Sequence, residues 1–255
     1  MPGSFRRITV LLRNRRIRTS GCSHSEKEQI MQTQSKEAIE KYLKQLHADY
    51  DPVYSMLMNY QCAVMEVETK FNILNNLFSL KDERNPIESI KSRVKSLDSI
   101  LRKMESRHLP ITLEAVEENL KDVAGVRVVC SFIDDIYNIA DSFLAQDDVT
   151  LIDRKDYIQN PKPSGYRSLH LIVKTPIYTD KGKKDMFVEV QLRTIAMDFW
   201  ASLEHKLRYK KNLNPQTAEE LAEELKTCAE ESAVLDEKMR SIRKRIAADS
   251  PESDS

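Results

Sequence analysis

Apolar residues recur in alternating steps of three and four along two long stretches of the chain, a spacing that predicts amphipathic helices. The first stretch covers residues 39–78 and is interrupted at Pro52, where two helices meet or one helix kinks. The second covers residues 221–246. Such stripes pack either on the domain's own core or on another subunit, and their length favours an oligomer.

Shorter segments between these stretches predict a mixed region. Helical spacing marks residues 86–106, 113–120, 134–146 and 194–209, and short apolar runs mark strands at residues 125–132, 149–153, 168–175 and 186–193. The turn at Thr179–Gly182 predicts a hairpin between the last two strands. Strands that alternate with helices and end in a hairpin indicate an α+β or α/β sheet flanked by helices.

The pattern divides the chain into five parts. We expect N-terminal helices at residues 31–80, a central α+β domain at 86–210, a C-terminal helix at 215–247 and a polar tail at 248–255. Residues 1–30 are expected to be a disordered leader or an upstream extension. Residues 1–25 hold six arginines and no acid, as a transit peptide does, but they contain no secretory apolar segment.

Composition narrows the class of protein. The 255 residues are 40% hydrophobic and 31% charged, and no apolar run approaches the roughly 18 residues of a membrane span. Beyond the arginine-rich start the chain carries a net charge of −6, which does not suit a non-specific nucleic-acid binder and argues against DNA as a partner. The four cysteines are scattered, as expected of reduced thiols in a cytoplasmic protein.

Two segments combine side chains suited to a nucleotide. The loop Lys162-Pro-Ser-Gly-Tyr-Arg-Ser-Leu-His170 offers an aromatic ring, three cationic or imidazole groups and a glycine that lets the backbone approach closely. The segment Glu189-Val-Gln-Leu-Arg-Thr194 places Glu189, Gln191 and Arg193 on one face of a strand, because strand side chains alternate.

Other charged residues add to this candidate site. Asp122, at the entrance of a strand, is expected to hold Mg²⁺ together with Glu189, since Mg²⁺ prefers one or two carboxylates plus phosphate oxygens. Arg127 lies on an otherwise apolar strand and is a candidate to stack on a base. Asp198 interrupts an apolar helix face, and a carboxylate matches the N1–H and N2–H donors of guanine.

Arg93, Lys95 and Lys103 form a basic set within the predicted helix 86–106. Cations beside a nucleotide loop can hold a triphosphate. Arg93 and Lys103 are ten residues apart, however, and do not share one helix face closely, which limits the expectation that all three meet one phosphate chain.

Five motifs in order resemble the synthetase domain of the RelA/SpoT family, the enzymes that make (p)ppGpp. They are Ser92-Arg-Val-Lys-Ser96, Asp122-Val-Ala-Gly-Val-Arg127, the loop 162–170, the segment 189–194 and Phe199-Trp-Ala-Ser-Leu-Glu-His205. The chain has no metal-hydrolase His-Asp segment and therefore resembles the stand-alone small alarmone synthetases, in particular their RelP/YwaC branch.

The resemblance implies a GTP pyrophosphokinase of the stringent response on a mixed, nucleotidyltransferase-like sheet. ATP would donate its β,γ-pyrophosphate to the 3′-hydroxyl of GDP or GTP, leaving AMP. By position, Arg93, Lys95 and Lys103 would hold ATP phosphates and Arg127 would stack on adenine. Asp122 and Glu189 would bind Mg²⁺, Tyr166 would stack on guanine, Lys162 and His170 would contact acceptor phosphates, and Gln191 would support the site. The resemblance favours a homotetramer and leaves the acceptor open among GMP, GDP and GTP.

One position departs from the family pattern. Lys155 stands where many members have an arginine that serves as a second adenine platform, and an ammonium group cannot stack as a plane. We expect weaker ATP affinity from this change. The alternative function is a catalytically silent nucleotide- or RNA-binding regulator on the same fold, against which the presence of both Asp122 and Glu189 argues.

Overall fold

The computed structural model describes residues 52–80, 85–208 and 214–249. The chain divides into two units, residues 1–53 and 54–255, and the description below concerns the second unit. The expected leader at 1–30 and the first part of the predicted N-terminal stripe lie outside the described residues.

The second unit is built on one five-stranded mixed sheet in the order β1-β2-β5-β4-β3. Its strands are β1 (Ile87–Val94), β2 (Ala124–Cys130), β3 (Thr150–Asp156), β4 (Leu169–Thr179) and β5 (Gly182–Thr194). The central pair, β2 and β5, is parallel, and the other pairs are antiparallel. The predicted hairpin is confirmed, with β4 and β5 joined at Thr179 and Gly182.

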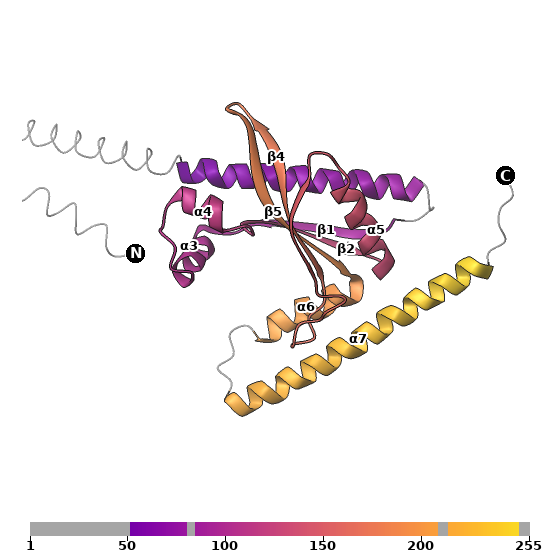
Figure 1. The fold of residues 1–255 in the computed structure, drawn as a ribbon. Helices are drawn as coiled ribbons and strands as arrows, with labels where there is room; N and C mark the ends of the chain where they lie inside the picture. The colour runs from indigo at the N-terminus through magenta and orange to yellow at the C-terminus, as the bar shows by residue number, and fades with distance from the viewer. Residues whose placement is uncertain (1–51, 81–84, 209–213, 250–255) are drawn as a thin grey trace, which may run out of the picture. The chain divides into compact units, whose positions relative to one another are not determined.

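Helix 52–80 and α5 (Ile133–Leu144) contribute to the core with the apolar face of the sheet (Figure 1). Tyr60, Phe71 and Phe143 are buried there, and the two phenylalanine rings stack at 4.4 Å. The strands contribute alternate residues, such as Val126 and Val190, because strand side chains alternate between faces. The buried face of helix 52–80 therefore packs on the domain's own core, which confirms that interpretation for the described part of the N-terminal stripe.

The predicted helix at residues 86–106 is wrong in its first half. Ile87–Val94 is the edge strand β1, and the helix α3 covers only Leu97–Ser106. A register irregularity between Ile87 and Ser89 interrupts the two-residue alternation in β1. The apolar residues Ile87, Ile90 and Val94 consequently fall at helix-like intervals of three and four, although β2 holds them in a sheet.

The remaining helices agree with the sequence. They are α4 (Leu113–Asn119), α6 (Ile195–Arg208) and α7 (Pro215–Asp249). α7 runs along α6 and also contacts α5 (Figure 1). The apolar stripe predicted for α7 is exposed at Leu235, Met239 and Ile242, whereas Leu225 packs against a small core cluster that includes Trp200 and Ala229.

Two expectations from composition can be compared with the described residues. Cys62, Cys130 and Cys228 are free thiols, and Cys22 lies outside the described residues. No helix in the described parts of the chain is long and apolar enough to cross a bilayer.

Candidate functional site

The face of the sheet opposite the core carries a row of polar side chains that crosses all five strands. Neighbouring strands place these residues in register, from β1 to β3: Lys91, Arg127, Gln191, His170 and Lys155. Glu189 lies on the same face of the central strand β5, two residues before Gln191. Because an exposed sheet face lined by charges cannot serve as core, this row marks the site.

Lys95 and Lys103 converge on Asp122 although they lie on different elements. Lys95 follows β1 and donates to Asp122 Oδ2 at 2.7 Å, and Lys103 on α3 donates to the same oxygen at 2.5 Å. Burial opposes ionisation of Asp122, but these hydrogen bonds and charges outweigh it and lower the pKa of this carboxyl. The turn between β1 and α3 thus brings together two cations that one continuous helix would have separated.

Arg93 and Arg127 are neighbours on β1 and β2. Arg93 is in register with Gly125, and its side chain passes over that glycine, where an added Cβ would meet Arg93 Cγ and Nε at 3.9 Å. Burial, then the charges of Arg193 and Arg93, lower the pKa of Arg127, while Asp198 acts in the opposite direction. Guanidinium groups gathered at one edge of the site favour a planar or anionic ligand.

The structure does not bring Lys155 and Arg127 together. Lys155 is in register with His170 at the far side of the sheet, and its ammonium lies 3.2 Å from Asp153. Three strand spacings separate Lys155 from Arg127, about 14 Å at roughly 4.8 Å each. Two groups that sandwich a purine lie about 7 Å apart, two contact distances of about 3.5 Å. The ATP-binding role of Lys155 stays a prediction, and Arg93 is the guanidinium that lies on the strand next to Arg127.

Glu189 stands between the two sides of the site. Its Oε2 accepts from Gln191 Nε2 at 3.0 Å, and its Oε1 lies 3.4 Å from His170 Nδ1. Burial raises the pKa of Glu189, but His170 and Gln191 outweigh burial, so the net shift is downward; the charge of Asp122 is close enough to oppose it. The predicted common face of Glu189, Gln191 and Arg193 is confirmed by the hydrogen bonds among them.

The carboxylates of Asp122 and Glu189 are available to bind a metal, but they do not make up a complete set of ligands. In the part of the chain that the structure describes, no three acidic, histidine or cysteine side chains group as a metal site. Asp122 Oδ1 is buried and has no hydrogen-bond partner. A buried carboxylate oxygen without a partner fits a cation that takes one or two carboxylates and completes its shell with phosphate oxygens.

An aromatic cluster forms the other side of the site. Tyr166 and His170 are joined by a 2.8 Å hydrogen bond, and Tyr157 packs edge-on to both rings. The Lys162 ammonium lies 4.5 Å from the Tyr157 ring centre and 4.9 Å from that of Tyr166. The structure thus brings Lys162, Tyr166 and His170 together as predicted. Tyr157 was missed; its signal is an aromatic residue at the end of a strand, five positions before Lys162.

Asp198 is surrounded by cations. Its Oδ1 accepts from Arg127 Nη1 at 3.2 Å and from Arg193 Nη1 at 3.1 Å, and its Oδ2 lies 3.5 Å from Lys91. The sequence analysis placed Arg193 on the same face as Glu189 but predicted no role for it, and it predicted no role for Lys91. The guanine-reading role of Asp198 stays a prediction, and the structure adds arginine partners that the sequence did not indicate.

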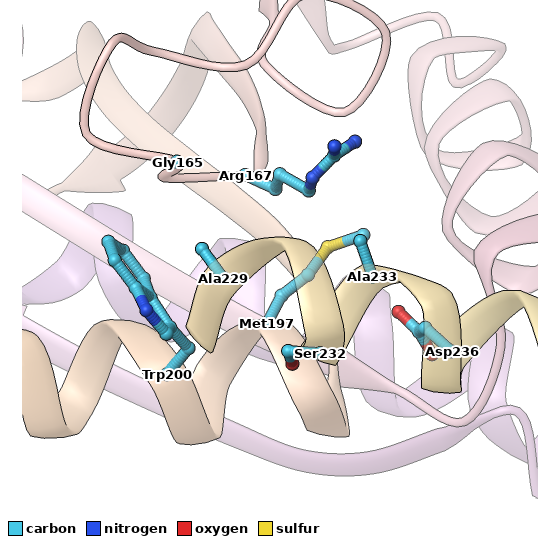
Figure 2. Close-up of a pocket in the computed structure, with 8 residues that line it drawn as sticks. All are labelled: Gly165, Arg167, Met197, Trp200, Ala229, Ser232, Ala233 and Asp236. Carbon is cyan, nitrogen blue, oxygen red and sulfur yellow. The ribbon is translucent and has the colours of Figure 1, made fainter. Parts of the chain in front are cut away.

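The helix α7 packs against the loop 162–170 at Gly165 (Figure 2). Gly165 and Arg167 of the loop, Met197 and Trp200 of α6 and four residues of α7 line a small cavity: Ala229, Ser232, Ala233 and Asp236. Trp200 Nε1 donates to the carbonyl of Leu225 at 2.8 Å, and Thr194 Oγ1 donates to Asp236 at 2.5 Å. These bonds fix α7 to the end of β5 and to α6.

The known proteins that the chain resembles agree with one another in family and activity. The family model described as "Region found in RelA / SpoT proteins" matches residues 92–214. The chain is 46% identical over 190 residues to GTP pyrophosphokinase YwaC of Bacillus subtilis (strain 168), covering 74% of this chain and 90% of the relative. It is 40% identical over 190 residues to GTP pyrophosphokinase YjbM of the same organism, covering 74% and 88%.

A solved structure shares the fold. The small alarmone synthetase 1 from Bacillus subtilis, bound to its product pppGpp, is similar with a TM-score of 0.69 and 39% identity. The match covers 76% of this chain and 98% of that protein. The α+β class and the mixed sheet expected from the sequence are confirmed by this likeness.

Proposed function

The chain belongs to the RelA/SpoT family, and we propose that it is a GTP pyrophosphokinase that makes (p)ppGpp from ATP and GDP or GTP. The activity rests on its relatives, of which two are GTP pyrophosphokinases and one is a synthetase holding pppGpp. The observation in this structure that carries the proposal is the position of Glu189. It lies on the central strand, between a cationic side formed by β1, β2 and α3 and the aromatic side at β4.

The cationic side is the site for ATP. Lys95 and Lys103, which meet at Asp122, would bind phosphate oxygens, and Arg93 and Arg127 would hold the adenine and neutralise charge. The aromatic side is the site for the acceptor. Tyr166 offers a ring for guanine, while Lys162 and His170 lie beside it for phosphate groups.

Asp122 and Glu189 would hold Mg²⁺, and the partnerless Asp122 Oδ1 supports this assignment. When bound, the ion would offset negative charge on the transferred pyrophosphoryl group. The chain's own residues do the remainder: lysines and arginines orient the donor, and the aromatic cluster orients the acceptor.

Transfer requires one proton acceptor near the ribose. The acceptor's 3′-oxygen bonds to the β-phosphorus of ATP, and the bond from that phosphorus to the oxygen shared with the α-phosphorus breaks. AMP leaves with the shared oxygen. Glu189, ionised and held by Gln191 and His170, takes the proton of the 3′-hydroxyl.

We also propose a homotetramer in the cytoplasm, where its nucleotide substrates are found. Exposed apolar side chains on two helices support an oligomer: Met58, Met65, Ile73 and Leu77 on helix 52–80, and Leu235, Met239 and Ile242 on α7. Light scattering on the purified full chain tests the assembly, and a monomeric mass would refute it.

The activity is tested by incubating the purified protein with ATP and GMP, GDP or GTP, with and without Mg²⁺, and separating the nucleotides. AMP and a 3′-pyrophosphorylated guanosine are the expected products, formed only with Mg²⁺. Binding of nucleotides without AMP formation would instead support a silent regulator.

A further inference from the structure

The helix α7 docks on the rest of the domain through a largely polar face. Buried and half-buried residues recur along it every three or four positions: Leu225, Ala229, Ser232, Asp236, Arg240 and Arg243. Leu225 is the one large apolar residue among them, while Leu235, Met239 and Ile242 are exposed elsewhere on the helix. An amphipathic helix usually buries its apolar stripe instead. The attachment of α7 therefore depends on hydrogen bonds and ion pairs more than on apolar burial.

The first half of this face lies against the acceptor side of the candidate site. Leu225 and Ala229 pack with Trp200 in a small cluster, and Tyr166, the ring proposed for guanine, rests on the same cluster. Trp200 Nε1 donates to the carbonyl of Leu225 at 2.8 Å. Gly165, the residue before Tyr166, lies directly against Ala229 (Figure 2). The position of α7 therefore helps to determine the position of Tyr166.

The second half of the face is fastened to the beginning of α5 by two arginines. Arg240 Nη1 donates to Asp134 Oδ1 at 3.0 Å. Arg243 donates to the other oxygen of Asp134 at 3.0 Å and to Asp135 Oδ1 at 3.2 Å. The Arg243 guanidinium also lies 4.5 Å from the centre of the Phe132 ring. We call Arg240, Arg243, Asp134 and Asp135 the arginine clamp.

The arginine clamp differs from an ordinary surface ion pair. An isolated exposed pair contributes little to stability, because water and salt screen it. In the clamp, however, Asp135 is only 3% exposed. Both carboxylates also lie in the first turn of α5, where the helix dipole favours negative charge. Removing the arginines would leave a buried carboxylate without these cations, which is costly, so the clamp holds this end of α7 to α5.

We propose that the arginine clamp is a positioning device for the guanine-nucleotide site. Eleven residues with a rise of about 1.5 Å each place Arg240 about 16 Å along α7 from Ala229. By fastening its own end of this stiff helix, the clamp keeps the other end against the loop 162–170 and so keeps Tyr166 in place for the base. The kinetic consequence rests on the proposed function. The hold on the loop is a property of the nucleotide-free protein and does not depend on that function.

Hydrogen exchange on the nucleotide-free full chain tests the hold on the loop. The double variant Arg240→Met/Arg243→Met removes both cations and keeps apolar bulk at the two positions. Arg245→Met is the matched control, because Arg245 is an exposed arginine on the same helix.

Two amides report on the loop. The Gly165 amide donates to the carbonyl of Lys162 at 2.8 Å, and the Lys162 amide donates to the carbonyl of Tyr166 at 3.1 Å. Both are expected to exchange at least about threefold faster in the double variant, since their hydrogen bonds open more often when α7 is released. Exchange in β2 and β5 is expected to stay as in the unsubstituted protein, and the control variant is expected to change neither.

Unchanged exchange of the loop in the double variant overturns the proposal. Faster exchange in β2 and β5 as well as in the loop also overturns it, since the effect is then a general loss of stability. If the double variant does not fold, Arg240→Met alone decides, because Arg243 still pairs with Asp134 and Asp135 in that protein.

The consequence for the site is read from steady-state kinetics and from calorimetric titration with GDP. The double variant is expected to raise KM and Kd for GDP about three- to tenfold, while KM for ATP and kcat change less than about twofold. Arg240→Lys/Arg243→Lys keeps both charges and is expected to recover most of the affinity. A lower kcat with unchanged KM for GDP would indicate a smaller folded fraction and overturns the proposal. An inactive unsubstituted protein refutes the proposed function and leaves the hydrogen-exchange result standing.

Discussion

Gly165 lies so close to α7 that a Cβ atom added to it would come within 2.5 Å of Ala229 Cβ. The backbone of Gly165 also has φ +85°, a conformation that residues other than glycine rarely adopt. The loop that carries Tyr166 is thus held against the C-terminal helix at a point where only glycine fits, which links α7 to the acceptor side of the site.

Gly165→Ala is expected to destabilise the protein and to weaken guanine-nucleotide binding. Gly182→Ala is the matched control, since Gly182 has φ +103° but open space around its added Cβ. The positive φ alone costs about 1 kcal/mol or somewhat more, and the clash adds to this only at Gly165. Chemical denaturation and titration with GDP measure the two effects. Equal results for the two variants would mean that contact with Ala229 does not matter.

Glu189→Gln is expected to lower AMP formation by at least about 10²-fold, because an amide cannot accept the ribose proton. Guanine-nucleotide binding should persist, as measured by calorimetry. Glu118→Gln, an exposed change on α4, serves as control. Turnover at the wild-type rate in Glu189→Gln would exclude this carboxylate as proton acceptor.

Asp198→Asn separates two roles for one carboxylate. Since Asp198 Oδ1 binds Arg127 and Arg193, loss of its charge is expected to raise KM for ATP about five- to tenfold, equivalent to about 1 kcal/mol or slightly more. The guanine-reading role predicts in addition that the preference for GDP over inosine diphosphate falls. An unchanged preference would leave Asp198 only its role of holding the two arginines.

Arg93→Ala and Lys155→Ala are expected to act on different substrates. Arg93 neighbours Arg127, and its loss should raise KM for ATP about tenfold or more. Lys155 lies beside His170, and its loss should raise KM for the guanine nucleotide more than KM for ATP. A larger effect of Lys155→Ala on ATP would support the sequence-based assignment instead.

The substitution Asp236→Asn is expected to remove a loss of stability that the wild-type protein undergoes as pH rises. Burial raises the pKa of Asp236 in the folded protein, while Thr194, which donates to it, acts against burial. The folded state therefore binds this proton more tightly than the unfolded chain, so wild-type stability falls as pH rises through the folded pKa. Denaturation at several pH values should show the variant gaining on the wild type from acidic to neutral pH. A constant difference would show that Asp236 titrates normally.

The sequence by itself determined most elements and the composition of the site. Helical periodicity located α5, α6 and α7, and two-residue alternation placed Glu189, Gln191 and Arg193 on one face. These features depend on residues near one another in the chain, which is why they can be read locally.

Only the tertiary structure decided which groups meet. β1 was mistaken for a helix because an irregularity in its pairing with β2 changes the local spacing. Strand order placed Lys155 far from Arg127, and the fold brought Lys95 and Lys103 to one oxygen of Asp122. Arg127 and Lys91, two of the partners of Asp198, likewise lie on segments distant from it in sequence. Strand order and register arise from packing between such segments, which local periodicity does not encode.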